Sequence, residues 1–262
     1  MLYPGFINLP RSVVRWQTGF AARITRTLSH QDLIELTRHL AIGDIHGCYT
    51  ALQSLLQSIN VRDDDVLITL GDYINRGPST AAVLDYLIDT YSKGRLHPLR
   101  GNHEIIMLDA RHDELELKKW LEVGGRETLL SYAPLGEDAG KLTDIPDAHW
   151  QFVESNLLPY YETDTHFFVH ASAYPDVALS DQPDFMLYWE RYNDPPKHES
   201  GKIMVCGHTS QKSGIPITNG NAICIDTWAF GSGWLTCLDI DSGKLWQSNE
   251  KGETRQMWLD EL

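Results

Sequence analysis

Short aliphatic runs alternate with amphipathic stretches in the first third of the chain. The runs at 39–42, 66–70 and 95–99 predict strands, whereas 51–59 and 80–91 carry apolar residues at helical spacing and predict helices. Alternation of strands with helices is typical of βαβ units, whose strands pair in parallel. The first hundred residues therefore predict an α/β fold.

Strand patterns return in the last hundred residues, separated by turn-forming residues. They cover 165–169, 203–206, 222–225 and 234–238. The pattern predicts two mixed β-sheets packed as a sandwich and flanked by helices.

Between the two strand-rich parts, about 104–158 reads as a polar helical insert, interrupted at Gly124 and Pro134, that is expected to cap a site. Residues 1–37 form a basic extension, with arginines interleaved among apolar residues at nearly helical spacing. We expect this extension to pack on the domain as an amphipathic helix. The rest of the chain, 38–262, is expected to be one domain, because no stretch resembles a long linker.

Composition and charge exclude several classes of protein. The formal net charge of −14 opposes binding to nucleic acid, whose affinity depends on cationic side chains. No apolar run approaches the roughly 18 residues of a membrane span. The four cysteines form no C-x-x-C pair, so we expect buried reduced thiols and a cytoplasmic location.

Five predicted strands end in loops that carry polar groups, four of them with glycine. The loops read GDIHG (43–47), GDYINRG (71–77), RGNHE (100–104), VHA (169–171) and CGHT (206–209). Loops at strand ends are where α/β proteins place ligand sites, and glycine allows close approach of a substrate. The five loops together predict one functional site.

The side chains in these loops match the donors that borderline divalent metals prefer, which are carboxylate, imidazole and amide groups. The candidate ligands are Asp44, His46, Asp72, Asn102, His170 and His208. A carboxylate such as Asp72 can bridge two ions. The remaining histidines, such as His166 and His198, lack this context and are expected to be structural.

In combination, GDIHG, GDYINRG and GNHE, followed by the late histidines of FVHA and GHT, resemble the bacterial branch of the phosphoprotein phosphatase (PPP) family. This family belongs to the calcineurin-like metallophosphoesterases and includes serine/threonine and tyrosine protein phosphatases. The resemblance spans about 38–240. It implies the metallophosphoesterase fold and a metal-dependent phosphatase that acts on phosphoproteins or small phosphomonoesters.

The resemblance also implies roles for the candidate residues. Asp44, His46 and Asp72 would hold one divalent ion, and Asp72, Asn102, His170 and His208 a second, with manganese expected and iron or zinc as alternatives. Arg76, together with Arg191 as the weaker match, would bind the phosphoryl oxygens, and His103 would protonate the leaving group. A hydroxide that bridges the metals would attack phosphorus directly.

Asn75 departs from the family pattern, which has Asp at this position paired with the histidine of GNHE. An amide oxygen can accept the N–H of His103, but it has no charge with which to raise the pKa of that histidine. An amide that presents its NH2 group to the ring would instead select the wrong tautomer. Weaker proton donation should slow hydrolysis of serine and threonine phosphates more than that of tyrosine or aryl phosphates. Asn75 therefore argues against a strict serine/threonine specialist.

Two other functions stay open. Symmetrical diadenosine tetraphosphate hydrolases have similar motifs and also lack Asp at position 75, although they usually read GNHD rather than GNHE. A non-catalytic scaffold could keep the metals while Asn75 suppresses turnover. The survival of every candidate ligand, with His103 and Arg76, favours an enzyme.

Overall fold

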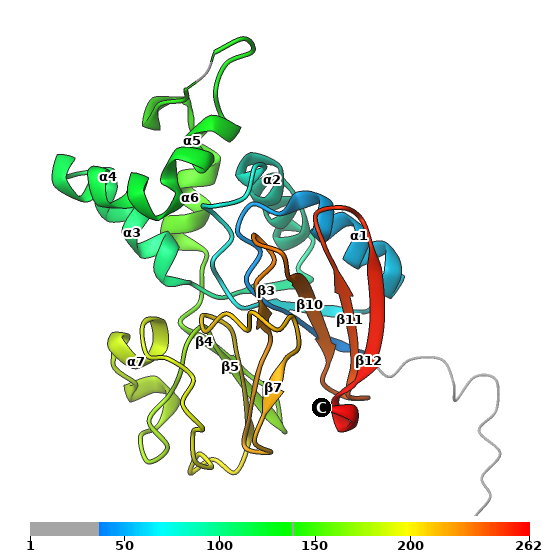
Figure 1. Cartoon of the computed structure of the whole chain (residues 1–262). Coiled ribbons are helices and arrows are strands. Elements are labelled where there is room, and N and C mark those ends of the chain that lie inside the picture. Colours follow the sequence, from blue (N-terminus) through cyan, green and yellow to red (C-terminus); the bar gives the residue numbers. More distant parts are fainter. Residues whose placement is uncertain (1–36, 138) are drawn as a thin grey trace, which may run out of the picture. The chain divides into compact units, whose positions relative to one another are not determined.

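The computed structural model describes residues 37–137 and 139–262, so the extension predicted in 1–37 lies, apart from Thr37, outside the described residues. The described chain forms two β-sheets with helices outside them (Figure 1). The two-sheet α/β architecture predicted from the sequence is confirmed. Among the described residues, no helix has the length and apolar character needed to cross a membrane.

The first sheet contains the parallel strands predicted at the start of the chain. Its path is β12 (Thr254–Trp258), β11 (Lys244–Ser248), β10 (Trp234–Asp239), β1 (His39–Ile42), β2 (Val66–Thr69) and β3 (Leu96–Pro98), and β9 (Asp226–Thr227) pairs with β10. Strands β1, β2 and β3 are parallel, and β10 joins β1 in antiparallel register. The sheet is therefore mixed.

Of the four strands predicted in the last hundred residues, β10 joins the first sheet and the other three belong to the second sheet. Its order is β4 (Tyr160–Glu162), β5 (His166–Val169), β6 (Ile203–Cys206), β8 (Ala222–Cys224) and β7 (Ile217–Thr218). Strands β5, β6 and β8 are parallel, while β4 and β7 close the two edges in antiparallel register. This sheet is also mixed.

The sheets pack face to face through a shared apolar layer. Ala41 and Ile68 from the first sheet meet Phe168, Val205 and Ile223 from the second. Their neighbours along the strands point the other way, as the two-residue period of a strand requires. The layer between the sheets is the core of the sandwich.

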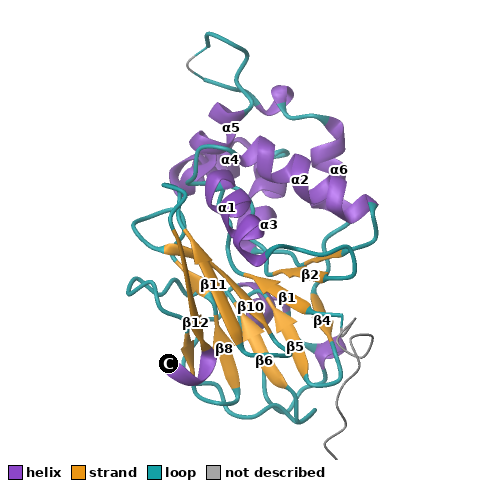
Figure 2. Ribbon diagram, turned by 90° about the vertical axis from the view of Figure 1, so that its right-hand side faces the viewer, coloured by secondary structure: helices purple, strands orange, loops and turns teal. Residues whose placement is uncertain are grey.

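Helices cover the outer face of the first sheet. They are α1 (Tyr49–Ile59), α2 (Thr80–Ser92), α3 (Asn102–Ala110), α4 (Glu114–Trp120), α5 (Arg126–Ser131) and α6 (Asp147–Ser155). Figure 2 shows these helices gathered on one side of the strands. The short α7 (Asp184–Tyr188) instead packs against the outer face of the second sheet.

The predicted helical insert is confirmed, with the predicted break at its glycines. Between α4 and α5 the chain makes a π-helical turn, Leu121–Gly125, in which Gly124 has φ of 110°. Only glycine adopts such a backbone angle without strain. This kink points the carbonyl of Gly124 at the backbone N–H of Arg76, at 3.2 Å.

Candidate active site

All five predicted loops meet at one place, because the parallel strands of each sheet deliver their carboxyl ends to the same edge. Several residues there have a positive φ, which non-glycine residues rarely adopt. They are His46, Asp72, Asn75, Arg76, His208 and Trp228. Such backbone strain gathers at functional sites, where the surrounding structure holds it in place.

Side chains of the types that could hold a metal ion fall into two groups that share Asp72. One group is His46, Asp72 and His103, and the other is Asp72, His170 and His208, with the ligand atoms of each group within 4.8 Å of one another. The shared carboxylate fits the bridging role predicted for Asp72. The geometry of both groups therefore suits a pair of cations.

Three lone pairs converge in the second group. The ring of His170 donates from Nδ1 to the carbonyl of Leu70, and that of His208 donates from Nε2 to the carbonyl of Trp189. The other nitrogen of each ring faces Oδ1 of Asn102, at 2.9 and 3.0 Å. Three acceptor atoms therefore face one another, which is an arrangement that a divalent cation would satisfy.

Burial keeps these histidines neutral, which is the form that binds a metal. Burial lowers the pKa of His170 to about 4. Burial, together with the neighbouring His170, lowers the pKa of His208 to about 3. Burial likewise raises the pKa of Asp72 to about 7, which a bound cation would reverse.

Asp44 lies close to the two groups but belongs to neither of them. Its buried carboxylate accepts the backbone N–H of His208, at 3.0 Å from Oδ2. Burial and the carboxylates of Asp226 and Asp72 raise its pKa well above the usual range. In this structure Asp44 thus orients the His208 loop, and its predicted role as a ligand stays a prediction.

Sequence reasoning assigned no role to Glu104, the last residue of GNHE. Its fully buried carboxylate accepts the backbone N–H groups of Gly101, Asp72 and Tyr73, each at 2.9 Å. These bonds tie the loop after β2 to the loop after β3. Glu104 therefore fixes the backbone that carries Asp72.

Asp226 also escaped the sequence analysis, because it follows a short strand without a glycine loop. Its carboxylate accepts the hydroxyl of Ser210 at 2.6 Å and the backbone N–H of Trp228 at 3.0 Å. Asp226 is buried beside Asp44. It connects the His208 loop with the loop that carries Trp228.

The predicted pair of Asn75 and His103 is present. Nδ2 of Asn75 lies 2.6 Å from Nδ1 of His103, and Oδ1 accepts the hydroxyl of Thr128 at 2.9 Å. The backbone N–H of Asn75 donates to the same hydroxyl, also at 2.9 Å. The amide thus presents a donor to His103, so the proton of the neutral ring lies on Nε2.

Arg76 enters the site from the same loop. Its guanidinium stacks on Phe230, with Cζ 4.4 Å from the ring centroid, and Nη1 donates to Nε2 of His46 at 2.8 Å. Phe230 also meets the ring of His46 edge-on, with centroids 4.9 Å apart. Sequence reasoning missed Phe230, which lies more than 150 positions from its partners.

A cavity of about 520 Å³ opens over these groups. Its lining residues are Asp72, Arg76, Asn102, His103, Arg191, His208, Thr209, Ser210, Lys212, Trp228 and Phe230. Arg191 therefore lines the same cavity as Arg76, as predicted for a pair of phosphate-binding guanidiniums. Planar guanidiniums suit the oxygens of a phosphate.

The described part of the helical insert contacts the backbone of the site residues and does not line the cavity. None of the cavity-lining residues just named belongs to 104–158. The insert reaches the site instead through the carbonyl of Gly124, which holds Arg76, and the hydroxyl of Thr128, which holds Asn75. Its predicted capping role stays a prediction.

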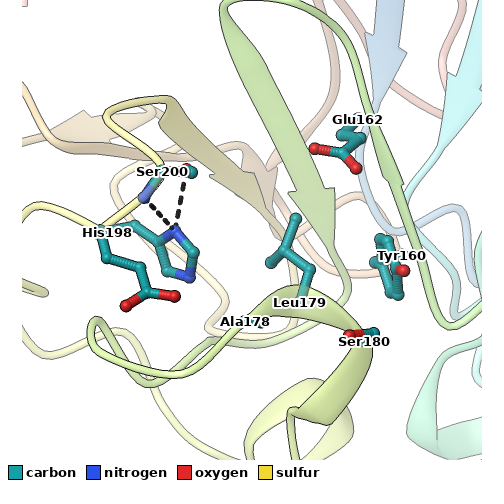
Figure 3. Close-up of a pocket in the computed structure, with 8 residues that line it drawn as sticks. Tyr160, Glu162, Ala178, Leu179, Ser180, His198 and Ser200 are labelled. Atoms are coloured by element: carbon teal, nitrogen blue, oxygen red, sulfur yellow. Dashed lines mark hydrogen bonds between the residues drawn. The ribbon is translucent and has the colours of Figure 1, made fainter.

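A separate hollow of about 400 Å³ lies between β4 and the loop around His198 (Figure 3). The ring of His198 accepts from the hydroxyl of Ser200 at 2.8 Å and donates to the carbonyl of Val177 at 3.0 Å. Both ring nitrogens are therefore satisfied by hydrogen bonds within the protein. This agrees with the structural role expected for His198.

A model of the calcineurin-like phosphoesterase family matches residues 37–231. The match covers most of the chain, so the chain belongs to this family. The family uses a centre of two divalent metals, which agrees with the two groups that share Asp72. The resemblance inferred from the loops is confirmed.

Two curated relatives differ in activity. A symmetrical bis(5′-nucleosyl)-tetraphosphatase of Legionella pneumophila is 44% identical over 161 residues, 59% of this chain and 53% of that protein. Serine/threonine-protein phosphatase 1 of Salmonella typhimurium is 37% identical over 90 residues, 34% of this chain and 39% of that protein. The matched regions span about half or less of either relative.

The fold is also that of a solved cold-active protein tyrosine phosphatase. The TM-score is 0.55 at 17% identity, with 85% of this chain and 79% of that chain covered. At this identity the likeness concerns the fold alone.

Proposed function

We propose that this phosphoesterase hydrolyses phosphomonoesters with acidic leaving groups, such as aryl and tyrosyl phosphates, in preference to serine and threonine phosphates. The observation that carries this proposal is the contact between Nδ2 of Asn75 and Nδ1 of His103, at 2.6 Å. An N–H donor on Nδ1 stabilises the neutral imidazole over the imidazolium. Burial and the nearby His46 and Arg76 also lower the pKa of His103.

The residues that line the site have separate roles in the reaction. Arg76 and Arg191 bind and orient the phosphoryl oxygens. Two divalent ions, for which we propose manganese, would be held by two sets of side chains: Asp44, His46 and Asp72, and Asp72, Asn102, His170 and His208. When bound, such ions would lower the pKa of a water and offset negative charge on the phosphoryl oxygens. His103 donates a hydrogen bond from Nε2 to the leaving oxygen, which suffices for a phenolate but serves an alkoxide poorly.

The location that we propose is the cytoplasm. The four cysteines are free and buried, as expected of thiols in a reducing compartment.

The test compares native protein with Asn75→Asp, both stripped of metal and refilled with Mn²⁺. Initial rates are measured on p-nitrophenyl phosphate, a phosphotyrosine peptide and a phosphoserine peptide. The native protein should cleave the first two much faster. Asn75→Asp should gain about tenfold to hundredfold on phosphoserine alone, because a carboxylate restores the charged proton donor. Equal native rates on the two peptides, with chemistry limiting, would contradict the proposal.

A second candidate is the hydrolysis of symmetrical dinucleoside tetraphosphates. The Legionella relative supports it over more than half of this chain. A phosphoanhydride also has an acidic leaving group, so Asn75 is compatible with it. Diadenosine tetraphosphate is therefore added to the same rate series. Dominant cleavage of the dinucleotide would favour this candidate, and metal binding without turnover of any substrate would favour a scaffold.

A further inference from the structure

Part of the cavity wall has no role in holding metal or phosphate. Trp228 and Lys212 line the same cavity as Arg76 and Arg191, and Trp228 is partly exposed. We propose that the indole of Trp228 is the surface on which an aromatic leaving group packs. The inference rests on the proposed function and adds a specificity-determining residue to it.

The contacts lead outward from the phosphate-binding group to this indole. The guanidinium of Arg76 stacks on Phe230, and the ring of Phe230 meets that of Trp228 edge-on, with centroids 6.2 Å apart. Phe230 thus contacts both the guanidinium of Arg76 and the indole of Trp228. A cavity of about 520 Å³ has room for a phosphoryl group together with the ring it is attached to.

The backbone holds Trp228 in a strained conformation. Its φ is 66°, a value that a bulky residue adopts only where the structure compels it. Its N–H donates to Asp226 at 3.0 Å, and its carbonyl accepts the N–H groups of Gly231 and Gly233, at 3.1 and 3.2 Å. Asp226 thereby ties the strained residue to the loop that carries His208.

Gly231 further fixes the ring. A Cβ at Gly231 would come within 2.3 Å of the indole, so the ring lies directly against the backbone of that glycine. A residue that served only to fill the interior would not need to line an open cavity. A ring held rigidly at the wall of the site is instead suited to binding another ring, because little conformational entropy is lost.

Lys212 adds charge to the same wall. Its Nζ lies 5.7 Å from the centroid of the indole. Together with Arg76 and Arg191, it gives the cavity three cationic lining residues among those described. An aryl phosphate dianion that packs on Trp228 would therefore lie among positive charges.

The test separates ring recognition from leaving-group acidity. It compares phenyl phosphate with hexafluoroisopropyl phosphate, an aliphatic ester whose parent alcohol is about as acidic as phenol. In the Mn²⁺-loaded variant Trp228→Asn, kcat/KM for the phenyl ester should fall about threefold to tenfold more than kcat/KM for the aliphatic ester. Asn is chosen because it tolerates a positive φ. Trp228→Tyr, which keeps an aromatic face, should restore most of the preference.

A matched control comes from the far end of the chain. Trp258 is exposed and has Lys244 at 5.8 Å from its ring, but it lies outside the cavity. Trp258→Asn should leave both rates unchanged. An equal fall for both esters in Trp228→Asn, or no change in either, would overturn the inference.

Failure of the proposed function can be distinguished from failure of the inference about Trp228. Because the two esters match in leaving-group acidity, their ratio does not depend on the role of Asn75. If the protein turned over neither ester, calorimetry with phenylphosphonate and ethylphosphonate would replace kinetics. A preference for phenylphosphonate that Trp228→Asn abolishes would support the aromatic wall, and equal affinities in the native protein would overturn it.

Discussion

At the scale of single residues, Thr128 sets the orientation of the amide that contacts the proton donor. Its hydroxyl accepts the backbone N–H of Asn75 and donates to Oδ1 of the same residue. Both residues are fully buried, so water cannot replace these bonds. The amide end that faces His103 is thus chosen by a hydroxyl from α5.

Replacement of Thr128 by Val should destabilise the fold. The change keeps the shape of the side chain but leaves the N–H of Asn75 without an acceptor, so the free energy of unfolding should fall by about 2 kcal/mol. Urea denaturation of native, Thr128→Val and Thr128→Ser proteins measures this. The Ser variant keeps the hydroxyl and should lose less. Equal losses in the two variants would show that the hydroxyl does not matter.

The residues that act at the site differ in how far the sequence could predict them. Ligand candidates such as Asp72 and His170 directly follow predicted strands, so topology alone brings them together. Thr128 and Phe230 were given no role at the site, because they come from a helix and a loop that only the tertiary fold brings to Asn75 and Arg76. Contacts of this kind leave no local pattern in the chain.

At the scale of elements, the π-helical turn between α4 and α5 positions Arg76. The carbonyl of Gly124 accepts the N–H of Arg76, and a Cβ at Gly124 would lie 2.5 Å from that nitrogen. The kink thus brings two backbones into direct contact. A helix without the kink could not approach the loop so closely.

Substitution of Gly124 by Ala should therefore impair catalysis. The added methyl group would displace Arg76, and kcat/KM for p-nitrophenyl phosphate should fall about tenfold or more. Gly136→Ala is the matched control, because Gly136 has φ of 90° but no heavy atom within 4 Å of an added Cβ. Gly136→Ala adds backbone strain without a steric clash, so the kcat/KM of this variant should stay near that of the native protein. Similar rates for the two variants would contradict this role of the kink.

Elements without a continuous apolar pattern were missed. Strand β11 buries Gln247, whose amide bonds to Gly214, Thr236 and Arg255. Its partner β12 alternates between exposed and half-buried positions at the edge of the sheet. Hydrophobic periodicity cannot mark such strands, because polar contacts with distant residues stabilise them.

At the scale of the whole molecule, the metal-ligating groups join the two sheets. His46 and Asp72 follow strands of the first sheet, whereas His170 and His208 follow strands of the second. Three buried carboxylates, Asp44, Asp72 and Asp226, lie among them. Burial raises the pKa of Asp44 and Asp72, and the nearby Asp226 raises both further. Cations at this position would neutralise the repulsion and hold the sheets together.

Divalent metal should accordingly stabilise the whole fold. At Mn²⁺ about 100-fold above its Kd, binding contributes about 2.7 kcal/mol. For a domain of this size, the melting temperature should rise by about 5–10 °C. Calorimetry of metal-free and Mn²⁺-loaded protein measures the shift, and Asp72→Asn should lose most of it. An equal shift in that variant would mean that manganese binds elsewhere.

The pocket around Asn75 has a consequence for how the enzyme could evolve. Asp has the shape of Asn, and the hydroxyl of Thr128 already points at the side chain as a donor. The codons for Asn and Asp differ only in their first base. On the role proposed here for Asn75, a single nucleotide change would shift the range of leaving groups without repacking the interior. The reverse nucleotide change would restore the original range of leaving groups. A single reversible mutation therefore separates the two substrate ranges.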